Sequence, residues 1–191
     1  MEYHGSIQVI RHATELHEPI DVVATADASL IPMLMYATNI PDTDQPYAEW
    51  FIRFATNKLS LAYSPSSKYA GEVTAENWYE IISRSDVRVG VADPRFDASG
   101  YRAMMVMVLA EGYYGKPGIF EDLFSGQFTY PVTRVNDNGR SIIHIPEVLE
   151  TKDDAHVLIR GASIQLIALL ESGDLDYAFE YESVIRQHQL S

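Results

Sequence analysis

The sequence predicts an α/β protein in which strands and helices alternate along the chain. Short runs of β-branched residues lie between polar residues, longer runs carry apolar residues at helical spacing, and turn-forming residues separate the two. Such alternation is typical of a sheet covered by helices. The 191 residues suffice for one large domain or two small lobes, and 47% hydrophobic residues exclude wholesale disorder.

The first third of the chain predicts a helix, a strand and a second, short helix. Apolar residues at helical spacing predict a helix in Gly5–Leu16, and Ser6, a residue type that often caps helices, is expected at its N-terminus. The β-branched run 20–27 predicts a buried parallel strand, and a short helix is expected over 29–36. Residues 38–49 contain prolines and show no periodicity, so they are expected to form a loop.

The stretch Trp50–Ser64 is long and alternates between apolar and polar residues. We interpret it as one extended strand, or two, crossing between subdomains. Beyond it, helices are expected over 76–84, 98–114, 119–124 and 163–171 and from Ser183, and strands over 87–92, 157–160 and 177–181. A hairpin is expected over 135–145, because Asn138 and Gly139 favour the positive φ of a tight turn.

Charge and composition exclude several classes of function. Acidic residues outnumber basic ones by 27 to 14, which argues against a broad electrostatic contact with nucleic acid or an anionic membrane. The chain has no cysteine, so disulfides, thiolate nucleophiles and cysteine-based metal sites are excluded. No apolar run approaches the roughly 18 residues of a membrane span. Met1 is not followed by a basic, apolar leader, and no signal peptide is expected in this chain.

Four places where a strand or loop leads into a helix predict an anion pocket. They are residues 4–6, 25–27, 92–100 and 161–163. In open α/β sheets ligands bind at such places, because unpaired backbone N–H groups and helix dipoles converge there. Small residues at three of the four would let an oxyanion approach the main chain.

Two carboxylates lie in regions where a simple anion pocket would avoid them. Asp97 immediately precedes the expected helix 98–114, and Glu180 lies near the end of the expected strand 177–181. Asp97 could instead serve as the N-terminal cap of its helix. Glu180 could instead pair with Arg102 or Arg186. The local sequence leaves both alternatives open, and only the fold can bring the two carboxylates together.

Several stretches together resemble the archaeal tungstate/molybdate-binding proteins, which are the substrate-binding components of ABC importers. The resemblance covers nearly the whole chain in the expected order, and its most specific blocks are DPRFDASGYR and LLESGDLDYAFEY. The stretches are GSIQVIRH, DVVATADASLIPMLM, EWFIRFATNKLSLAYS, ENWYEII, DPRFDASGYRAMMV and IQLIALLESGDLDYAFEYESV.

The resemblance implies a type II periplasmic-binding-protein fold, in which two α/β lobes close by a hinge motion on an oxyanion. Residues 1–56 would belong to an incomplete first lobe and residues 57–191 to the second lobe, since family members extend beyond this chain at both ends. The resemblance also implies a protein outside the cytoplasm that works with an ABC permease, needs no cofactor and is not an enzyme. Exposed surface on the first lobe would favour homo-oligomers.

The resemblance also assigns residues to the site. The metal atom of tungstate or molybdate would gain two carboxylate oxygens and become six-coordinate, with Asp97 and Glu180 as the ligands by motif position. Asp93 is the alternative for the first of them. The outer oxygens would accept hydrogen bonds from the backbone and hydroxyl of Ser6 and from the backbone of Ala26, Ser99 and Ser163.

Two other functions remain open on the sequence. Asp97 and Glu180 could act as the acid and base of an enzyme or bind a divalent cation. Alternatively, the chain could be a fragment that no longer binds anything. The sequence does not rank tungstate against molybdate, since the two anions have nearly the same size and charge.

Overall fold

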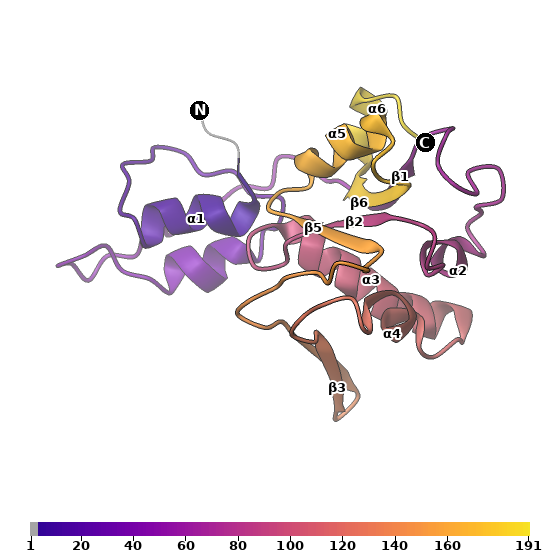
Figure 1. The fold of residues 1–191 in the computed structure, drawn as a ribbon. Coiled ribbons are helices and arrows are strands. Elements are labelled where there is room, and N and C mark those ends of the chain that lie inside the picture. The colour runs from indigo at the N-terminus through magenta and orange to yellow at the C-terminus, as the bar shows by residue number, and fades with distance from the viewer. Residues whose placement is uncertain (1–3) are drawn as a thin grey trace.

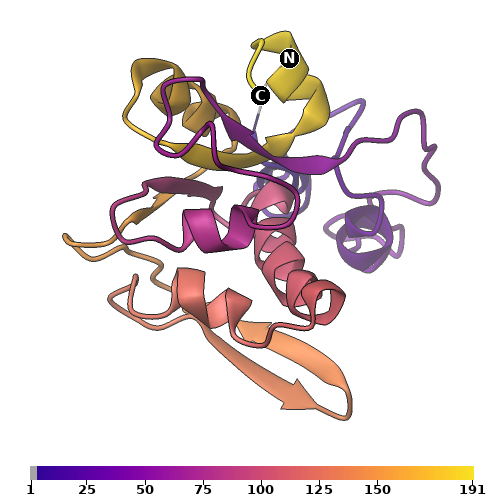
Figure 2. The same cartoon turned by 90° about the vertical axis from the view of Figure 1, so that its right-hand side faces the viewer.

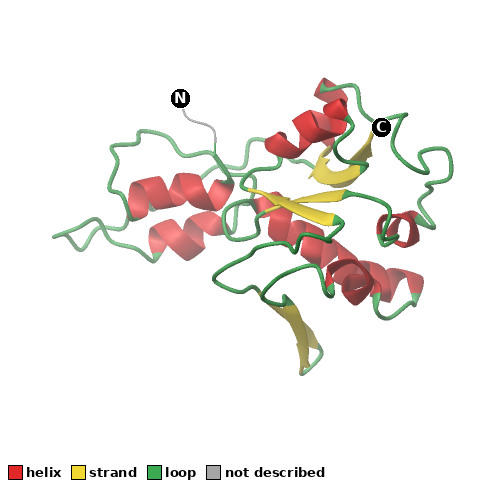
Figure 3. Ribbon diagram, in the orientation of Figure 1, coloured by secondary structure: helices red, strands yellow, loops and turns green. Residues whose placement is uncertain are grey.

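The computed structural model describes residues 4–191. Residues 1–3, on which the expectation of no signal peptide partly rests, lie outside the described residues. A mixed sheet lies at the centre, with strand order β1-β6-β2-β5 (Figures 1 and 3). Its strands are β1 (Leu59–Tyr63), β6 (Tyr177–Tyr181), β2 (Val89–Ala92) and β5 (Val157–Arg160). Strand β2 runs parallel to β5 and β6, and β1 runs antiparallel to β6. The predicted α/β class is therefore confirmed.

Helices cover both faces of this sheet (Figure 1). One face carries α2 (Trp78–Ile82), α3 (Ala98–Tyr114) and α4 (Ile119–Phe124), and the other α5 (Ile164–Ser172) and α6 (Glu182–Gln187). Strand β6 supplies both cores, because successive side chains point to opposite faces. Tyr177 and Phe179 pack in the larger core with α3 and α4, while Ala178 packs with α5.

A hairpin extends from the body below α4 (Figure 2). It consists of β3 (Thr133–Asp137) and β4 (Arg140–His144). As the sequence predicts, Asn138 and Gly139 form the turn with positive φ angles of 48° and 78°. Arg134 ties the hairpin to the body, because its guanidinium lies 2.7 Å from Glu111 and 3.0 Å from Glu121.

The N-terminal segment lies beside the body and contains α1 (Ser6–Thr14) and the short π-helical segment η1 (Ile31–Tyr36). They pack through a small apolar cluster of Ile10, Leu30, Ile31 and Met35. Gly5, and not Ser6, precedes the helix. The expectation that Ser6 caps α1 is therefore wrong, because its hydroxyl accepts a hydrogen bond from the Ala26 amide, at 3.0 Å.

Two of the expected strands differ from the prediction. Residues 20–27 form no strand, and Val22 is 83% exposed. Within residues 4–191 no neighbouring strand pairs with this run, and β-branched residues form a strand only where a partner accepts their hydrogen bonds. In the expected crossing stretch only Leu59–Tyr63 is a strand, because this part alone pairs with β6.

Candidate functional site

The turn between β2 and α3 positions Asp97. Its carboxylate caps α3, because Oδ1 accepts hydrogen bonds from the Ser99 amide at 2.8 Å and from the Ser99 hydroxyl at 2.9 Å. The alternative interpretation of Asp97 as a helix cap is thus confirmed. Gly100 allows this close packing, since a Cβ atom there would lie 2.2 Å from the Ala92 carbonyl oxygen.

The second oxygen of Asp97 reaches a different element. Oδ2 accepts a hydrogen bond from the backbone amide of Ser163, at 3.2 Å, across 66 residues of sequence. Ser163 immediately precedes α5. Asp97, Ser99 and Ser163 are all buried. The Asp97 carboxylate therefore joins the N-termini of α3 and α5 at the carboxyl ends of parallel strands, where open α/β sheets place ligands.

The side chain of Glu180, on β6, lies near Ser163 and Asp97. Its side chain is fully buried, and Oε1 accepts a hydrogen bond from the Tyr181 amide, at 2.6 Å. Among the residues that the structure describes, Oε2 has no hydrogen-bond partner. Burial raises the pKa of Glu180, and the charge of Asp97 raises it further. The Tyr181 amide and the nearby Ser163 hydroxyl lower the same pKa and oppose this shift in part.

The interpretation of Glu180 as an ion-pair partner is wrong. Arg102 pairs with Asp27, with 3.2 Å between the guanidinium and the carboxylate, and Arg186 pairs with Glu182. The fold therefore brings Asp97 and Glu180 together around Ser163, although they lie far apart in the sequence. A buried carboxyl with a free oxygen beside a second carboxylate can bind an electron-poor centre that would compensate for its charge.

Ser6 and Ala26, which the resemblance assigns as donors, lie on the N-terminal segment that contacts the turn carrying Asp97. Ser6 begins α1, and the amides of Ile7 and Gln8 donate to the Phe96 carbonyl at 3.1 and 3.4 Å. A Cβ atom on Gly5 would lie 2.4 Å from that same oxygen. The N-terminus of α1 is therefore in direct contact with the turn that carries Asp97.

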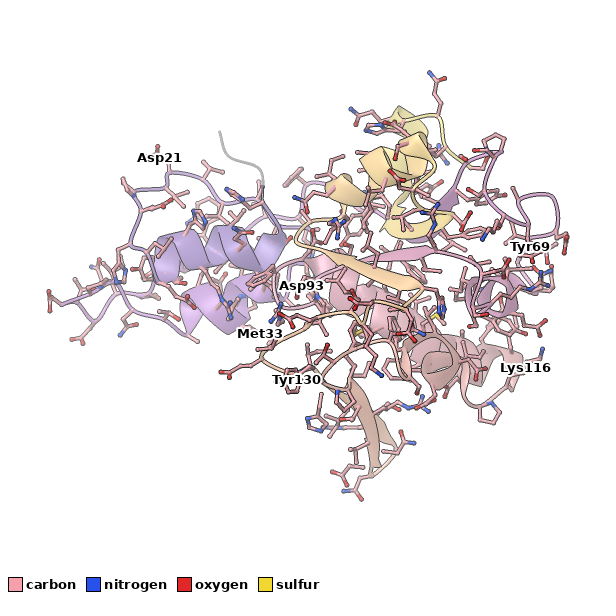
Figure 4. The ribbon with its side chains drawn as sticks, in the orientation of Figure 1. Asp21, Met33, Tyr69, Asp93, Lys116 and Tyr130 are labelled. Atoms are coloured by element: carbon pink, nitrogen blue, oxygen red, sulfur yellow. The ribbon has the colours of Figure 1, made fainter. Side chains whose placement is uncertain are left out.

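Asp93, the alternative ligand, is already engaged. Its buried carboxylate forms an ion pair with Arg95, with distances of 2.6 Å to Nη2 and 2.9 Å to Nε. Asp93 lies at the junction between the N-terminal segment and the body (Figure 4). Asp97 and Glu180 accept their hydrogen bonds from neutral donors, so no cationic side chain compensates them as Arg95 compensates Asp93.

Sequence reasoning missed Asp27. The Tyr101 hydroxyl donates to its Oδ2 at 2.6 Å, Ser29 donates to Oδ1, and Arg102 forms the ion pair described above. Burial alone would raise the pKa of Asp27, but the hydrogen bonds from Tyr101 and Ser29 and the charge of Arg102 lower it to about 2. Two signals could have directed attention to it: Asp27 lies in 25–27, one of the four expected anion-binding places, and Tyr101 and Arg102 belong to the block DPRFDASGYR.

Two surface hollows lie away from these carboxylates. One of about 500 Å³ lies beside β1 and is lined by Leu61, Trp78 and Phe179, among others. The other, of about 600 Å³, lies between α1 and η1. Neither is lined by Asp97 or Glu180. The candidate site is formed instead by buried side chains, those of Asp97, Ser99, Ser163 and Glu180.

Residues 4–191, the part of the chain that the structure describes, hold no further ligand cluster for a metal ion and no membrane-spanning helix. This part of the chain holds no group of three or more His, Asp or Glu side chains arranged to bind a metal ion. Within the same range, no helix combines the length and the apolar character needed to cross a membrane.

The chain matches known proteins over its whole length. It is 43% identical over 192 residues to the molybdate/tungstate-binding protein WtpA of Thermococcus kodakarensis and 42% identical over 191 residues to WtpA of Pyrococcus abyssi. It is also 43% identical over 190 residues to an uncharacterized solute-binding protein of Methanoculleus marisnigri. These alignments cover 99–100% of this chain, and the chain spans about half the length of the relatives.

These matches confirm the resemblance seen in the sequence. The family model described as bacterial extracellular solute-binding protein matches residues 1–191 of this chain. The chain therefore belongs to the family of bacterial extracellular solute-binding proteins.

Proposed function

We propose that this chain is part of a binding protein, not an enzyme, that holds tungstate or molybdate outside the cytoplasm and delivers it to an ABC permease. The observation that carries the proposal is the meeting of Asp97 and Glu180 around Ser163, with one Glu180 oxygen left without a partner within residues 4–191. The relatives named as molybdate/tungstate-binding proteins support the choice of anion.

The chemistry of the anion explains why carboxylates suit it. Two buried carboxylates would repel a dianion unless they bond directly to its central atom. The hexavalent metal of tungstate or molybdate can accept two further oxygens, whereas sulfate and phosphate do not readily expand their coordination. We infer that Asp97 and Glu180 select against those abundant anions by forming these bonds, and that pocket size is secondary.

Backbone amides would stabilise the outer oxygens of the anion. The proposed donors are Ser6 and Ala26 from the N-terminal segment and Ser99 and Ser163 from the body. Helix N-termini suit this role, because their amides have no partner within the helix and the helix dipole favours negative charge. The Ser163 amide, which donates to Asp97, would exchange this partner for an anion oxygen.

We further propose that residues 1–56 belong to one lobe and residues 57–191 to the other. The contacts of α1 with Phe96 support this division, since they lie where the two lobes would close. Because Asp97, Glu180 and Ser163 are buried, the anion would enter when the N-terminal segment swings away from α3. Such a hinge motion is common among binding proteins.

This chain alone is also proposed to self-associate. The extended segment before β1 exposes Trp50 by 75%, Ile52 by 69% and Phe54 by 78%. Exposed apolar patches of this kind mark surfaces that another protein covers.

Isothermal titration calorimetry tests the proposed site. The protein should bind tungstate and molybdate and not sulfate, and Asp97→Ala and Glu180→Ala should each abolish binding. Asp153→Ala and Glu150→Ala, which remove exposed carboxylates in a loop, serve as controls and should bind like the wild type. Binding retained in both site variants, or binding of Mg²⁺ without either oxyanion, would contradict the proposal.

A further inference from the structure

Asp27 connects two parts of the chain that the proposed function requires to move relative to each other. It lies between α1 and η1 and is bound from the first turn of α3. The Tyr101 hydroxyl donates to Oδ2 at 2.6 Å, and Arg102 Nη2 lies 3.2 Å from the same oxygen. The Asp27 side chain is 16% exposed, so water screens these contacts only partly.

The position of Asp27 places this contact beside the proposed oxyanion donors. The amide of Ala26, the preceding residue, donates to the Ser6 hydroxyl at 3.0 Å. On the other side, Tyr101 follows Ser99 by two residues in α3. A contact between Asp27 and Tyr101 therefore fixes how far Ser6 and Ala26 lie from the start of α3.

Arg102 extends the connection to a third element. Its Nη1 lies 3.5 Å from the hydroxyl of Tyr181, the residue that follows Glu180 at the end of β6. One guanidinium thus links the loop around Asp27 to the strand that carries a proposed ligand. The ion pair and both hydroxyl contacts are partly buried. They require the side chains of this cluster to keep their positions, namely Asp27, Tyr101, Arg102 and Tyr181.

We propose that Asp27 is a positioning residue that fastens the N-terminal segment to α3 and holds Ser6 and Ala26 opposite Asp97 when the oxyanion is bound. The inference rests on the proposed function. Asp27 does not contact the anion in this scheme. It acts through the Tyr101 and Arg102 contacts, and a bound anion leaves only after these contacts break.

Binding kinetics of single and double variants test this role. Asp27→Asn and Tyr101→Phe should each weaken tungstate binding about tenfold, the scale of one charge-assisted hydrogen bond. The loss should appear in the dissociation rate, with the association rate unchanged. The double variant should be no weaker than Asp27→Asn alone, because both changes remove the same contact.

Two matched controls separate this role from general effects of the substitutions. Asp21→Asn removes an exposed carboxylate at the outer edge of the same segment, away from α3 (Figure 4). Tyr113→Phe removes an exposed hydroxyl at the far end of α3. Both controls should bind tungstate with wild-type rates. Asp27→Asn with kinetics equal to those of Asp21→Asn, or fully additive effects in the double variant, would overturn the proposal.

Hydrogen exchange provides a second readout that does not depend on the anion. Asp27→Asn should accelerate exchange at the Ala26 and Ile7 amides, which are held where the segment meets the body. Unchanged exchange relative to Asp21→Asn would overturn the positioning role, whatever the binding data show. If the wild type binds neither tungstate nor molybdate, the proposed function fails, while the exchange data still decide whether Asp27 fastens the segment.

Discussion

At the scale of single residues, the surroundings of Glu180 do not favour stability. It is completely buried, and within residues 4–191 its Oε2 lacks a hydrogen-bond partner. Burial raises the pKa of Glu180, which means that the folded protein disfavours the charged carboxylate. Strained or unsatisfied groups of this kind are expected where a protein gives up stability to bind a ligand.

Replacing Glu180 by Gln should stabilise the protein at neutral pH while abolishing tungstate binding. A carboxyl whose pKa is higher in the folded state costs stability once pH rises above its unfolded value, and the neutral amide avoids this cost. Thermal unfolding at pH 7 should show a gain on the order of 1 kcal/mol, the usual scale of a single substitution. The gain should shrink as pH falls towards 4. A Glu180→Gln protein that is less stable than the wild type at pH 7 would contradict this reading of the site.

The ionised carboxylate of Asp27 should stabilise the folded protein, whereas that of Glu180 destabilises it. Its pKa is about 2 in the folded state and 3.8 in the reference state, so the contacts of the carboxylate contribute about 2 kcal/mol at neutral pH. That contribution is fully present above pH 4 and is lost as pH falls from about 4 to about 2. Urea denaturation should show Asp27→Asn less stable than Asp21→Asn at pH 7, with a difference that narrows below pH 4. If the two variants differed in stability by the same amount at pH 7 and pH 3, the Asp27 carboxylate would not be the source of the difference.

The sequence predicts some of the residues at the candidate site and does not predict others. Specific motif blocks mark Asp97 and Glu180 in the sequence, and both side chains are buried in the fold. The contact of Asp27 with Tyr101 cannot be predicted from the sequence, because the two residues lie 74 positions apart and no local motif around Asp27 indicates it. A side chain whose role depends on such distant partners is visible only in the fold.

At the scale of elements, the body of the protein was predictable because local and distant preferences agree there. Strand β6 alternates between the two cores, and α3 and α5 each end at a glycine in the left-handed conformation, Gly115 and Gly173. The run 20–27 failed as a strand because β propensity depends on a partner. The expected crossing stretch shortened to β1 for the same reason.

The start of α3 offers a test of how tightly its first turn is held. Gly100→Ala places a Cβ atom 2.2 Å from the Ala92 carbonyl oxygen, so α3 must shift away from β2. We expect a loss of about 1–3 kcal/mol, typical of overpacking, together with weaker tungstate binding. Gly112→Ala in the same helix meets nothing within 4 Å and should instead stabilise the protein by about 0.5–1 kcal/mol. Equal stability of the two variants in chemical denaturation would contradict the packing argument.

At the scale of the whole molecule, the two parts of the chain differ in how fully they are packed. The body buries two apolar cores on opposite faces of its sheet, whereas the N-terminal segment rests on the small cluster around Ile10 and Met35. The segment that joins them carries exposed Trp50 and Phe54. The resemblance predicts a boundary between the two lobes near residue 56. It does not predict how many side chains remain exposed there, because that depends on the three-dimensional arrangement.

This exposed joining segment leads to a prediction about association. Trp50, Ile52 and Phe54 alternate along an extended stretch, so burying them against a second copy would remove apolar area from water, at roughly 25 cal/mol per Å². Light scattering after gel filtration should give a mass above 21.5 kDa that rises with concentration. The triple variant Trp50→Ser, Ile52→Ser and Phe54→Ser should shift the protein towards the monomer. The matched double variant Met105→Ser and Leu109→Ser, which removes exposed apolar side chains on α3, should leave association unchanged. A monomer at all concentrations, or equal association of the triple variant and the wild type, would show that this segment does not mediate contact between copies.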